Sequence, residues 1–202
     1  MKKFTLSLAF ILCITFSINA QDLNYGAKAG LNIAGISFES DSYSTSSRIG
    51  FHVGGFVNYR FDEKFAIQPE INFSTGGNEW DFGNGDTTGE IKISNLSIPV
   101  LLQYDVVDNF VVEGGLQYNF LLSVEQKIDG SGDGFEDISE FYKSGTLGAA
   151  IGAIYQLDTL VPGLAAGLRF VFDLTNINDE DVDAGNLRQN AFQVNILYTI
   201  PK

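Results

Sequence analysis

The sequence predicts an all-β protein, an eight-stranded antiparallel up-and-down transmembrane β-barrel. Three observations lead to this fold class. Apolar and polar residues alternate along most segments, the connections between segments are alternately short and long, and aromatic residues gather at the segment ends that meet the short connections. A period of two residues is the pattern of a strand with two unlike faces. Long loops opposite short turns, with aromatic girdles, are typical of bacterial membrane barrels.

The first 20 residues predict a secretory signal peptide that is removed from the mature protein. Lys2 and Lys3 precede an apolar stretch over residues 4–18, and Ala20 ends a cleavage site. Cys13 is the one cysteine and lies in this stretch, so we expect the mature chain to have neither disulfides nor thiolate metal ligands. Residues 21–202 are then expected to form a single barrel domain.

The charge of the chain excludes some classes of partner. The net charge is −13, and removal of the two lysines of the signal peptide leaves −15. Such a chain repels nucleic acid, and the sequence contains no basic patch with interleaved aromatic residues. After the signal peptide, no apolar run approaches the roughly 20 residues that a membrane helix needs.

The clearest hairpin joins residues 49–59 and 65–75 through a short charged turn at 60–64. Odd positions in both arms are mostly apolar or aromatic. The even positions include these polar side chains: His52, Asn58, Gln68, Glu70 and Asn72. A strand places alternate side chains on opposite faces, so we predict a polar interior and an apolar face toward lipid.

The same alternation predicts six further strands. In chain order they span residues 24–33, 91–104, 110–124, 145–157, 164–175 and 192–199. Long loops are expected at residues 37–47, 76–89, 125–143 and 176–187, and further short turns at 105–109 and 158–163. The apolar positions change from odd to even within residues 91–104, which predicts a bulge near Ser94 and Asn95.

Several segments of the chain resemble the PorT-like outer-membrane β-barrel family of Bacteroidetes-type bacteria. The similar segments are residues 25–32, 50–54, 65–71, 96–104, 168–170 and 174–177. The resemblance covers essentially the whole mature chain, and a proline recurs in the family at the place of Pro99. It implies an eight-stranded integral protein of the bacterial outer membrane. It does not imply an activity.

The predicted inward positions carry charges of both signs. They include Lys28, Arg48, His52, Arg60, Glu70, Glu113, Arg169 and Asp173. Eight strands enclose an interior that side chains can fill, and charges inside a low-dielectric wall are costly unless they are paired. We therefore predict an interior network of salt bridges and hydrogen bonds that plugs the barrel. The alternative is a narrow conducting pore.

Two motifs suggest sites, and each has a simpler explanation. His52 near Ser74 or Glu70 could form part of a hydrolase, but nothing in the spacing places a nucleophile within its reach, and a hydrogen-bonded interior histidine is the favoured explanation. Residues 129–140 match a calcium loop in their oxygen ligands and turning glycine. The ligands would be Asp129, Ser131, Asp133, Asp137 and Glu140. An acidic loop that is simply solvated gives the same pattern. We assign no catalytic, cofactor-binding or metal-binding residue.

The leading functional hypothesis is a structural or interaction barrel of the outer membrane, without catalysis. Its partners would be outer-membrane lipid, lipopolysaccharide and unidentified proteins at the acidic external loops, and the barrel would be a monomer. The alternatives are a small-solute channel, a soluble lipocalin-like calyx and a barrel enzyme that acts on lipid. The calyx needs apolar inward positions, whereas Arg169, Glu113 and Gln117 lie on the face opposite the apolar residues.

Overall fold

The computed structural model describes residues 23–37, 44–81, 88–128, 134–179 and 187–201. The expected signal peptide lies outside these residues. Among the described residues, the 3-10 helix η2 (Ser139–Phe141) is a single turn. No helix in this part of the chain is long and apolar enough to cross a membrane.

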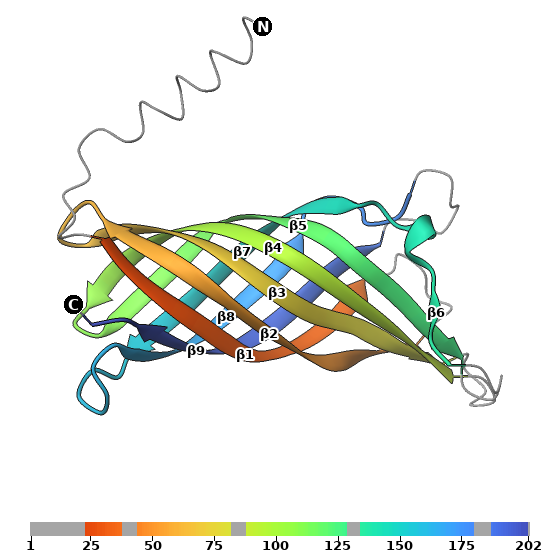
Figure 1. Cartoon of the computed structure of the whole chain (residues 1–202), viewed down its shortest axis with the longest axis horizontal. Coiled ribbons are helices and arrows are strands. Elements are labelled where there is room, and N and C mark those ends of the chain that lie inside the picture. Colours follow the sequence, from red (N-terminus) through yellow and green to blue (C-terminus); the bar gives the residue numbers. More distant parts are fainter. Residues whose placement is uncertain (1–22, 38–43, 82–87, 129–133, 180–186, 202) are drawn as a thin grey trace, which may run out of the picture.

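Eight long strands in the described residues form a closed antiparallel barrel (Figure 1). In ring order they are β1 (Leu23–Ser37), β2 (Ser44–Arg60), β3 (Phe65–Asp81), β4 (Thr88–Val107), β5 (Phe110–Ile128), β7 (Gly145–Gln156), β8 (Leu164–Asp173) and β9 (Arg188–Thr199). The pairing of β1 with β9 and of β4 with β5 closes the ring. A two-residue strand, β6 (Glu136–Asp137), pairs with β5 outside the ring. The predicted fold class is confirmed.

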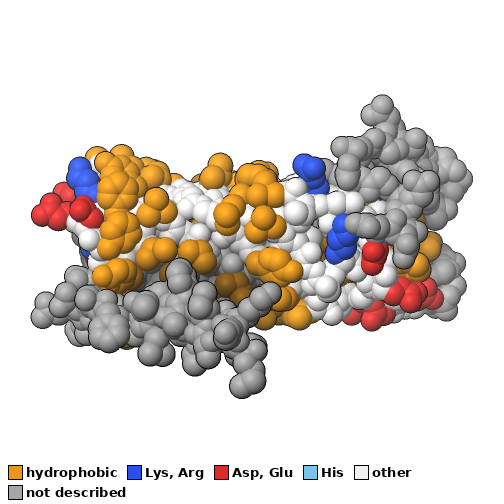
Figure 2. Space-filling view, turned by 90° about the horizontal axis from the view of Figure 1, so that it is seen from above, with side chains coloured by type: hydrophobic (Ala, Val, Ile, Leu, Met, Phe, Trp, Pro, Cys, Tyr) orange, Lys and Arg blue, Asp and Glu red, His pale blue; other side chains and the backbone are white. Residues whose placement is uncertain are grey.

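The wall of the barrel has its apolar face outside. Leu31 and Ile151 point away from the lumen and are 57% and 58% exposed, whereas the inward Arg169 is 2% exposed. Figure 2 shows hydrophobic side chains spread over the wall, while the described charged side chains gather toward the two ends. A soluble protein buries its apolar side chains instead. The outer face is therefore suited to lipid, as the alternation predicted.

The three short connections and both ends of the barrel chain lie at one end of the molecule (Figure 1). Residues 61–64, 108–109 and 157–163 form these connections. Aromatic rings pack at this short-turn end: the centroids of Phe61 and Phe65 lie 6.2 Å apart, and those of Phe65 and Tyr104 lie 4.9 Å apart. These three side chains of the predicted aromatic ring therefore do gather at this end.

The strands extend farther toward the opposite, long-loop end than the sequence predicted. The glycine-rich segment 76–89 was expected to be a loop, but β3 runs to Asp81 and β4 begins at Thr88. Gly77 has φ of +130°, which distorts the strand without ending it. Gly89 lies under the Trp80 ring, so close that an added Cβ would be 2.3 Å from it. The glycines here permit a distorted strand and a close contact, and they do not mark a loop.

At the long-loop end, the side chains that face the barrel interior are apolar and no longer polar. Ile91 and Ile93 of β4 point into the barrel and are buried, while Lys92 between them lies outside and pairs with Glu125. The predicted bulge near Ser94 and Asn95 was placed in the wrong strand. The pairing is irregular there, since Ser94 faces Ser123 and Asn95 faces Leu121, so the extra residue belongs to β5.

The bulge in β5 turns Val124 inward, where it is fully buried, and not outward as its spacing from Phe110 suggested. It joins an apolar cluster inside the long-loop end: Ile36, Ile91, Ile93, Val124, Ile177 and Leu187. A membrane strand needs about 9–11 residues, whereas β4 has 20. The part of the barrel beyond lipid thus has an apolar inside and a charged outside, as a water-soluble sheet does.

Candidate functional site in the barrel lumen

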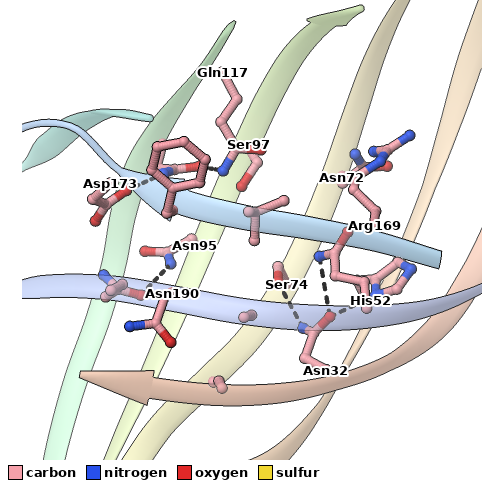
Figure 3. Close-up of a pocket in the computed structure, with 18 of the residues that line it drawn as sticks. Asn32, His52, Asn72, Ser74, Asn95, Ser97, Gln117, Arg169, Asp173 and Asn190 are labelled. Atoms are coloured by element: carbon pink, nitrogen blue, oxygen red, sulfur yellow. Dashed lines mark hydrogen bonds between the residues drawn. The ribbon is translucent and has the colours of Figure 1, made fainter. Parts of the chain in front are cut away.

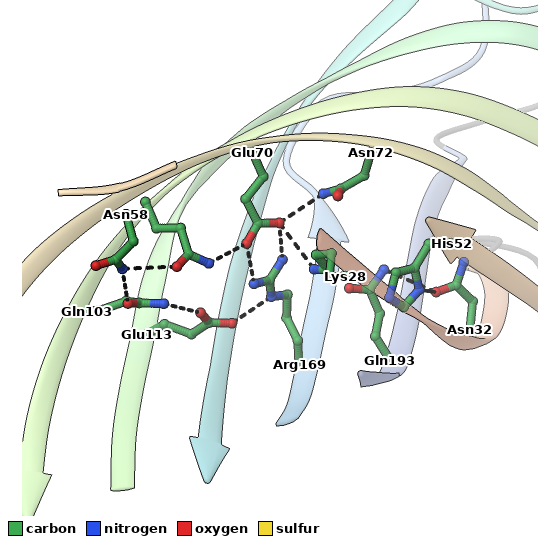
Figure 4. Close-up of polar contacts among 11 residues, drawn as sticks. Lys28, Asn32, His52, Asn58, Glu70, Asn72, Gln103, Glu113, Arg169 and Gln193 are labelled. Atoms are coloured by element: carbon green, nitrogen blue, oxygen red, sulfur yellow. Dashed lines mark hydrogen bonds and ion pairs between the residues drawn. The ribbon is translucent and has the colours of Figure 1, made fainter. Parts of the chain in front are cut away.

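A cluster of four buried charges lies at the centre of the lumen (Figure 4). Arg169 of β8 donates to both carboxylate oxygens of Glu70 on β3, with Nη1–Oε2 and Nη2–Oε1 distances of 2.9 and 2.8 Å. Its Nε donates to Glu113 Oε1 of β5 at 2.7 Å. Lys28 Nζ of β1 lies 3.1 Å from Glu70 Oε2. Two cations thus neutralise two carboxylates, which is the condition for burying them at tolerable cost.

Amide side chains take up the remaining lone pairs of the two carboxylates. Glu70 accepts hydrogen bonds from Gln68 Nε2 and Asn72 Nδ2, both at 2.9 Å, and Glu113 accepts one from Gln103 Nε2 at 3.1 Å. Asn58 Nδ2 then donates to Gln68 Oε1 and Gln103 Oε1 at 3.0 and 2.7 Å. The predicted interior network is confirmed for Lys28, Glu70, Glu113 and Arg169.

Arg48 and Arg60 were predicted in the same network but lie outside it. Arg60 pairs with Asp105 at 2.6 Å at the short-turn rim, where both side chains are partly exposed. Arg48 pairs with Glu90 toward the long-loop end and is also partly exposed. Their positions near the strand ends explain the difference, because only the middle of each strand faces the closed lumen.

His52 takes part in a separate group of hydrogen bonds. Its Nδ1 lies 2.7 Å from Asn32 Oδ1, and Asn32 Nδ2 donates to Ser74 Oγ at 2.9 Å. Gln193 Nε2 also donates to Asn32 Oδ1, at 3.1 Å. Within the described residues no hydrogen bond joins His52 to Ser74 or Glu70. Asn32 organises this group, and its place on the polar face of its strand was the only sequence signal for it.

Among the described residues, the remaining interior carboxylate is Asp173, which accepts hydrogen bonds from Asn119 Nδ2 at 2.9 Å and Thr146 Oγ1 at 3.1 Å. Asp173, His52 and Arg169 help to line a lumen cavity of about 50 Å³ (Figure 3). Because a water molecule occupies about 30 Å³ of liquid, this cavity has room for water but not for a solute.

Apolar side chains close the lumen on both sides of the polar centre. The cluster around Ile93 and Ile177 fills the long-loop end. A second buried cluster on the short-turn side consists of Phe56, Val111, Ile154 and Leu197, and Gln68 and Gln103 line the same part of the lumen. Along the barrel axis, the charged centre therefore lies between two layers that each contain a buried apolar cluster.

The calcium-loop hypothesis falls partly beyond the described residues, since Asp129, Ser131 and Asp133 lie there. In the described part of this loop, Asp137 Oδ1 accepts hydrogen bonds from Ser139 N at 2.9 Å and Ser139 Oγ at 2.5 Å. These bonds lower the pKa of the Asp137 carboxyl. No group of three or more His, Cys, Asp or Glu residues within the described ranges could hold a metal ion. Calcium binding remains a hypothesis.

The fold, the apolar wall and the closed polar lumen define a small integral β-barrel protein of the outer membrane. The chain belongs to the outer membrane protein beta-barrel domain family, whose model matches residues 19–179. By the orientation rule for such barrels, the short-turn end faces the periplasm and the long-loop end faces the exterior.

Two solved bacterial structures have the same fold as this chain. Neisserial surface protein A has a TM-score of 0.55 at 13% identity, over 87% of this chain and 97% of that one. Ail, the attachment invasion locus protein of Yersinia pestis, has a TM-score of 0.55 at 12% identity, over 88% of this chain and 98% of that one. At these identities the similarity establishes the fold alone. No curated protein sequence matches the chain.

Proposed function

We propose that the protein is a non-conducting barrel that works through its external end as an interaction protein, without catalysis. The observation that carries the proposal is the closed lumen, in which two apolar layers flank a neutral salt-bridge cluster. A pore needs a continuous aqueous path, and packed apolar layers oppose one. With the lumen filled, the surfaces available for function lie at the two ends.

At the external end, the described segments 134–143 and 176–179 form an ordered cap. Lys143 N donates to Ile177 O at 2.8 Å and Asp179 N donates to Phe141 O at 3.2 Å, so the chain after β5 is held to the chain after β8. Ile138 N donates to Val124 O at 2.9 Å, which attaches the same cap to the barrel wall. Backbone bonds of this kind give the cap a fixed shape, as a recognition surface requires.

The exposed face of the cap suits a protein partner with a basic surface. Phe135 and Phe141 are exposed beside Glu136, Asp137 and Glu140. Exposed aromatic side chains are common anchors in interfaces, and the acidic residues supply charge complementarity. Ail is named as an attachment invasion locus protein, and one of its structures is a complex with the heparin analogue sucrose octasulfate. The acidic cap here favours a cationic partner over such a polyanion.

The barrel is a PorT-like member of its family, as the similar segments suggest. It functions as a monomer surrounded by outer-membrane lipid and lipopolysaccharide. His52 has an architectural role, which is supported by its bond to Asn32 and by the ion pairs that occupy Glu70.

Planar-bilayer recording of the refolded protein tests the closed lumen. We expect no steady conductance steps above the lipid background. Large, stable steps would overturn the non-conducting assignment and favour the small-solute channel. A matched variant, Arg169→Ala, shortens the central side chain but leaves both apolar clusters in place, so it should also show no steady steps.

Cross-linking on intact cells tests the interaction role. A photo-cross-linker is attached to Glu140→Cys in the cap and, as a control, to Lys64→Cys in the periplasmic turn. We expect a discrete cross-linked protein from the cap position only, with a yield that falls as salt is raised. Equal products from both positions, or none from the cap, would contradict a partner at the external end.

A further inference from the structure

A blind cavity of about 470 Å³ opens at the periplasmic mouth of the barrel. Its volume falls within the roughly 300–1,000 Å³ of typical small-molecule sites. Four of its lining residues, Phe56, Val111, Ile154 and Leu197, belong to the buried apolar cluster, so the cavity has an apolar floor beside the buried amides of Gln68 and Gln103. A molecule that enters from the periplasm would reach this floor and stop.

The walls of the cavity carry neutral polar groups with unused capacity. Asn58 uses Nδ2 for its two bonds to Gln68 and Gln103, and Oδ1 remains as an acceptor. Asn24 and Gln156 also line the cavity, and neither side chain is hydrogen-bonded to another part of the described chain. A side-chain amide offers two donors and one acceptor oxygen. These walls can therefore bind an amide or similar polar backbone.

Two opposite charges stand on opposite walls of the same cavity. Arg60 ends β2 and Asp158 lies two residues after the end of β7, and these two strands are four places apart in the ring of eight. Arg60 donates through Nη1 to Asp105 Oδ2 and Glu63 O, which leaves other guanidinium N–H groups. Asp158 Oδ1 accepts from Gly163 N at 2.7 Å, which leaves Oδ2.

We propose that this cavity is a periplasm-facing binding site for a short zwitterionic peptide with an apolar side chain. The ligand carboxylate pairs with Arg60, its ammonium group pairs with Asp158, its amide bonds to the wall amides, and its side chain rests on the apolar floor. Each element of such a ligand has a counterpart in the cavity. A hydrocarbon chain would use the floor alone and would leave both charges unused.

The dipeptide leucyl-leucine is the probe, titrated calorimetrically into the full mature protein in lipid nanodiscs. We expect saturable binding that weakens about tenfold or more in Arg60→Gln and in Asp158→Asn, because each removes a charge-assisted contact. The matched controls are Lys64→Gln and Asp62→Asn in the neighbouring turn. Asp62 Oδ1, like that of Asp158, accepts a turn N–H, here from Lys64 at 3.3 Å. These controls should bind as the wild type does.

A third variant tests the cavity without touching its charges. Ala165→Leu adds volume to the cavity wall and should weaken binding while the barrel stays folded. The capped analogue N-acetyl-leucyl-leucine amide should bind at least tenfold more weakly than leucyl-leucine. The proposal is overturned if leucyl-leucine does not saturate, if the capped analogue binds equally, or if decanoate binds and the dipeptide does not. Planar-bilayer recording tests only whether the lumen conducts, and the titrations test only the cavity. The non-conducting assignment and the peptide-binding proposal can therefore be refuted independently.

Discussion

Arg169 and Glu70 join two strands that lie diametrically opposite each other in the barrel. Arg169 is on β8 and Glu70 on β3, four places apart in the ring in either direction. The guanidinium meets both carboxylate oxygens, at 2.8 and 2.9 Å, and both side chains are almost completely buried. The planar fork of arginine fixes distance and orientation together. This pair therefore ties the two halves of the wall across the lumen.

Replacing Arg169 by methionine should destabilise the barrel strongly. The substitution leaves Glu70 and Glu113 as buried carboxylates with only Lys28 to balance them. Breaking a buried pair from one side costs about 3–5 kcal/mol. Urea unfolding in lipid vesicles measures the loss.

The matched control for this variant is Arg60→Met. Its pair with Asp105 is partly exposed, and such pairs contribute about 0–1 kcal/mol. Equal losses for Arg169→Met and Arg60→Met would contradict the central role of the buried cluster. The stability of Arg169→Lys should lie between those of the wild type and Arg169→Met, since lysine keeps the charge but cannot form the paired hydrogen bonds of the guanidinium.

The alternation of apolar and polar residues predicted every barrel strand. It also predicted the inward position of four charged residues: Lys28, Glu70, Glu113 and Arg169. Both predictions held because, where the wall crosses the membrane, alternate side chains face lipid and the polar lumen. It could not predict which charges pair, since partners such as Arg169 and Glu70 lie 99 residues apart. Pairing depends on how far each strand is staggered around the ring. That stagger is a property of the closed barrel and not of a single strand.

The sequence interpretation was wrong where the surroundings of the wall change. At Ile91 and Ile93 the apolar residues of β4 change from even to odd positions. The reason is that β4 extends beyond the lipid there, so its apolar side chains face the interior of the barrel. A bulge in β4 would produce the same pattern of residues. The pattern alone cannot separate these causes, and only the burial of Val124 and the charged exterior at Lys92 distinguish them.

Adjacent glycines of β5 should respond differently to alanine. A Cβ on Gly115 would lie 2.0 Å from Val100 O and 2.9 Å from Leu101 Cα, both backbone atoms of β4. A Cβ on Gly114 would meet no atom closer than 3.8 Å. We expect Gly115→Ala to cost about 1–3 kcal/mol through forced strand separation. Gly114→Ala should stay within about 0.5 kcal/mol of wild type. Urea unfolding compares them, and equal losses would refute the close approach of β4 and β5.

Thiol labelling should locate the lipid boundary on β4. Lys92 and Val100 both lie on the outer face, and their side chains are about equally accessible, with 37% exposure for the Lys92 side chain and 45% for Val100. On intact cells, Lys92→Cys should react quickly with a membrane-impermeant maleimide, and Val100→Cys should not. After the protein is unfolded, both should react. Similar rates in the folded protein would mean that lipid does not cover Val100.

The cap should loosen when Ser139 is replaced by alanine. Ser139 Oγ accepts the N–H of Val124 at 2.9 Å and donates to Asp137, so it fastens the cap to β5. Loss of one such bond costs about 1 kcal/mol, which corresponds to about fivefold faster cleavage of the cap in limited proteolysis. Ser47→Ala on the exposed part of β2 is the control and should leave the rate unchanged.

The contact between Ser139 and Asp137 also makes the stability of the cap depend on pH. Hydrogen bonds from Ser139 lower the pKa of Asp137 below its ordinary value of 3.8, so the ionised carboxylate favours the ordered cap. A lowered pKa contributes stability that is fully present above the unfolded value and is lost as the pH falls through the folded value. Hydrogen exchange of the Val124 amide should therefore show constant protection at neutral pH and weaker protection below about pH 4. Asp137→Asn should abolish this acid dependence, and an unchanged profile in that variant would assign it to another carboxylate.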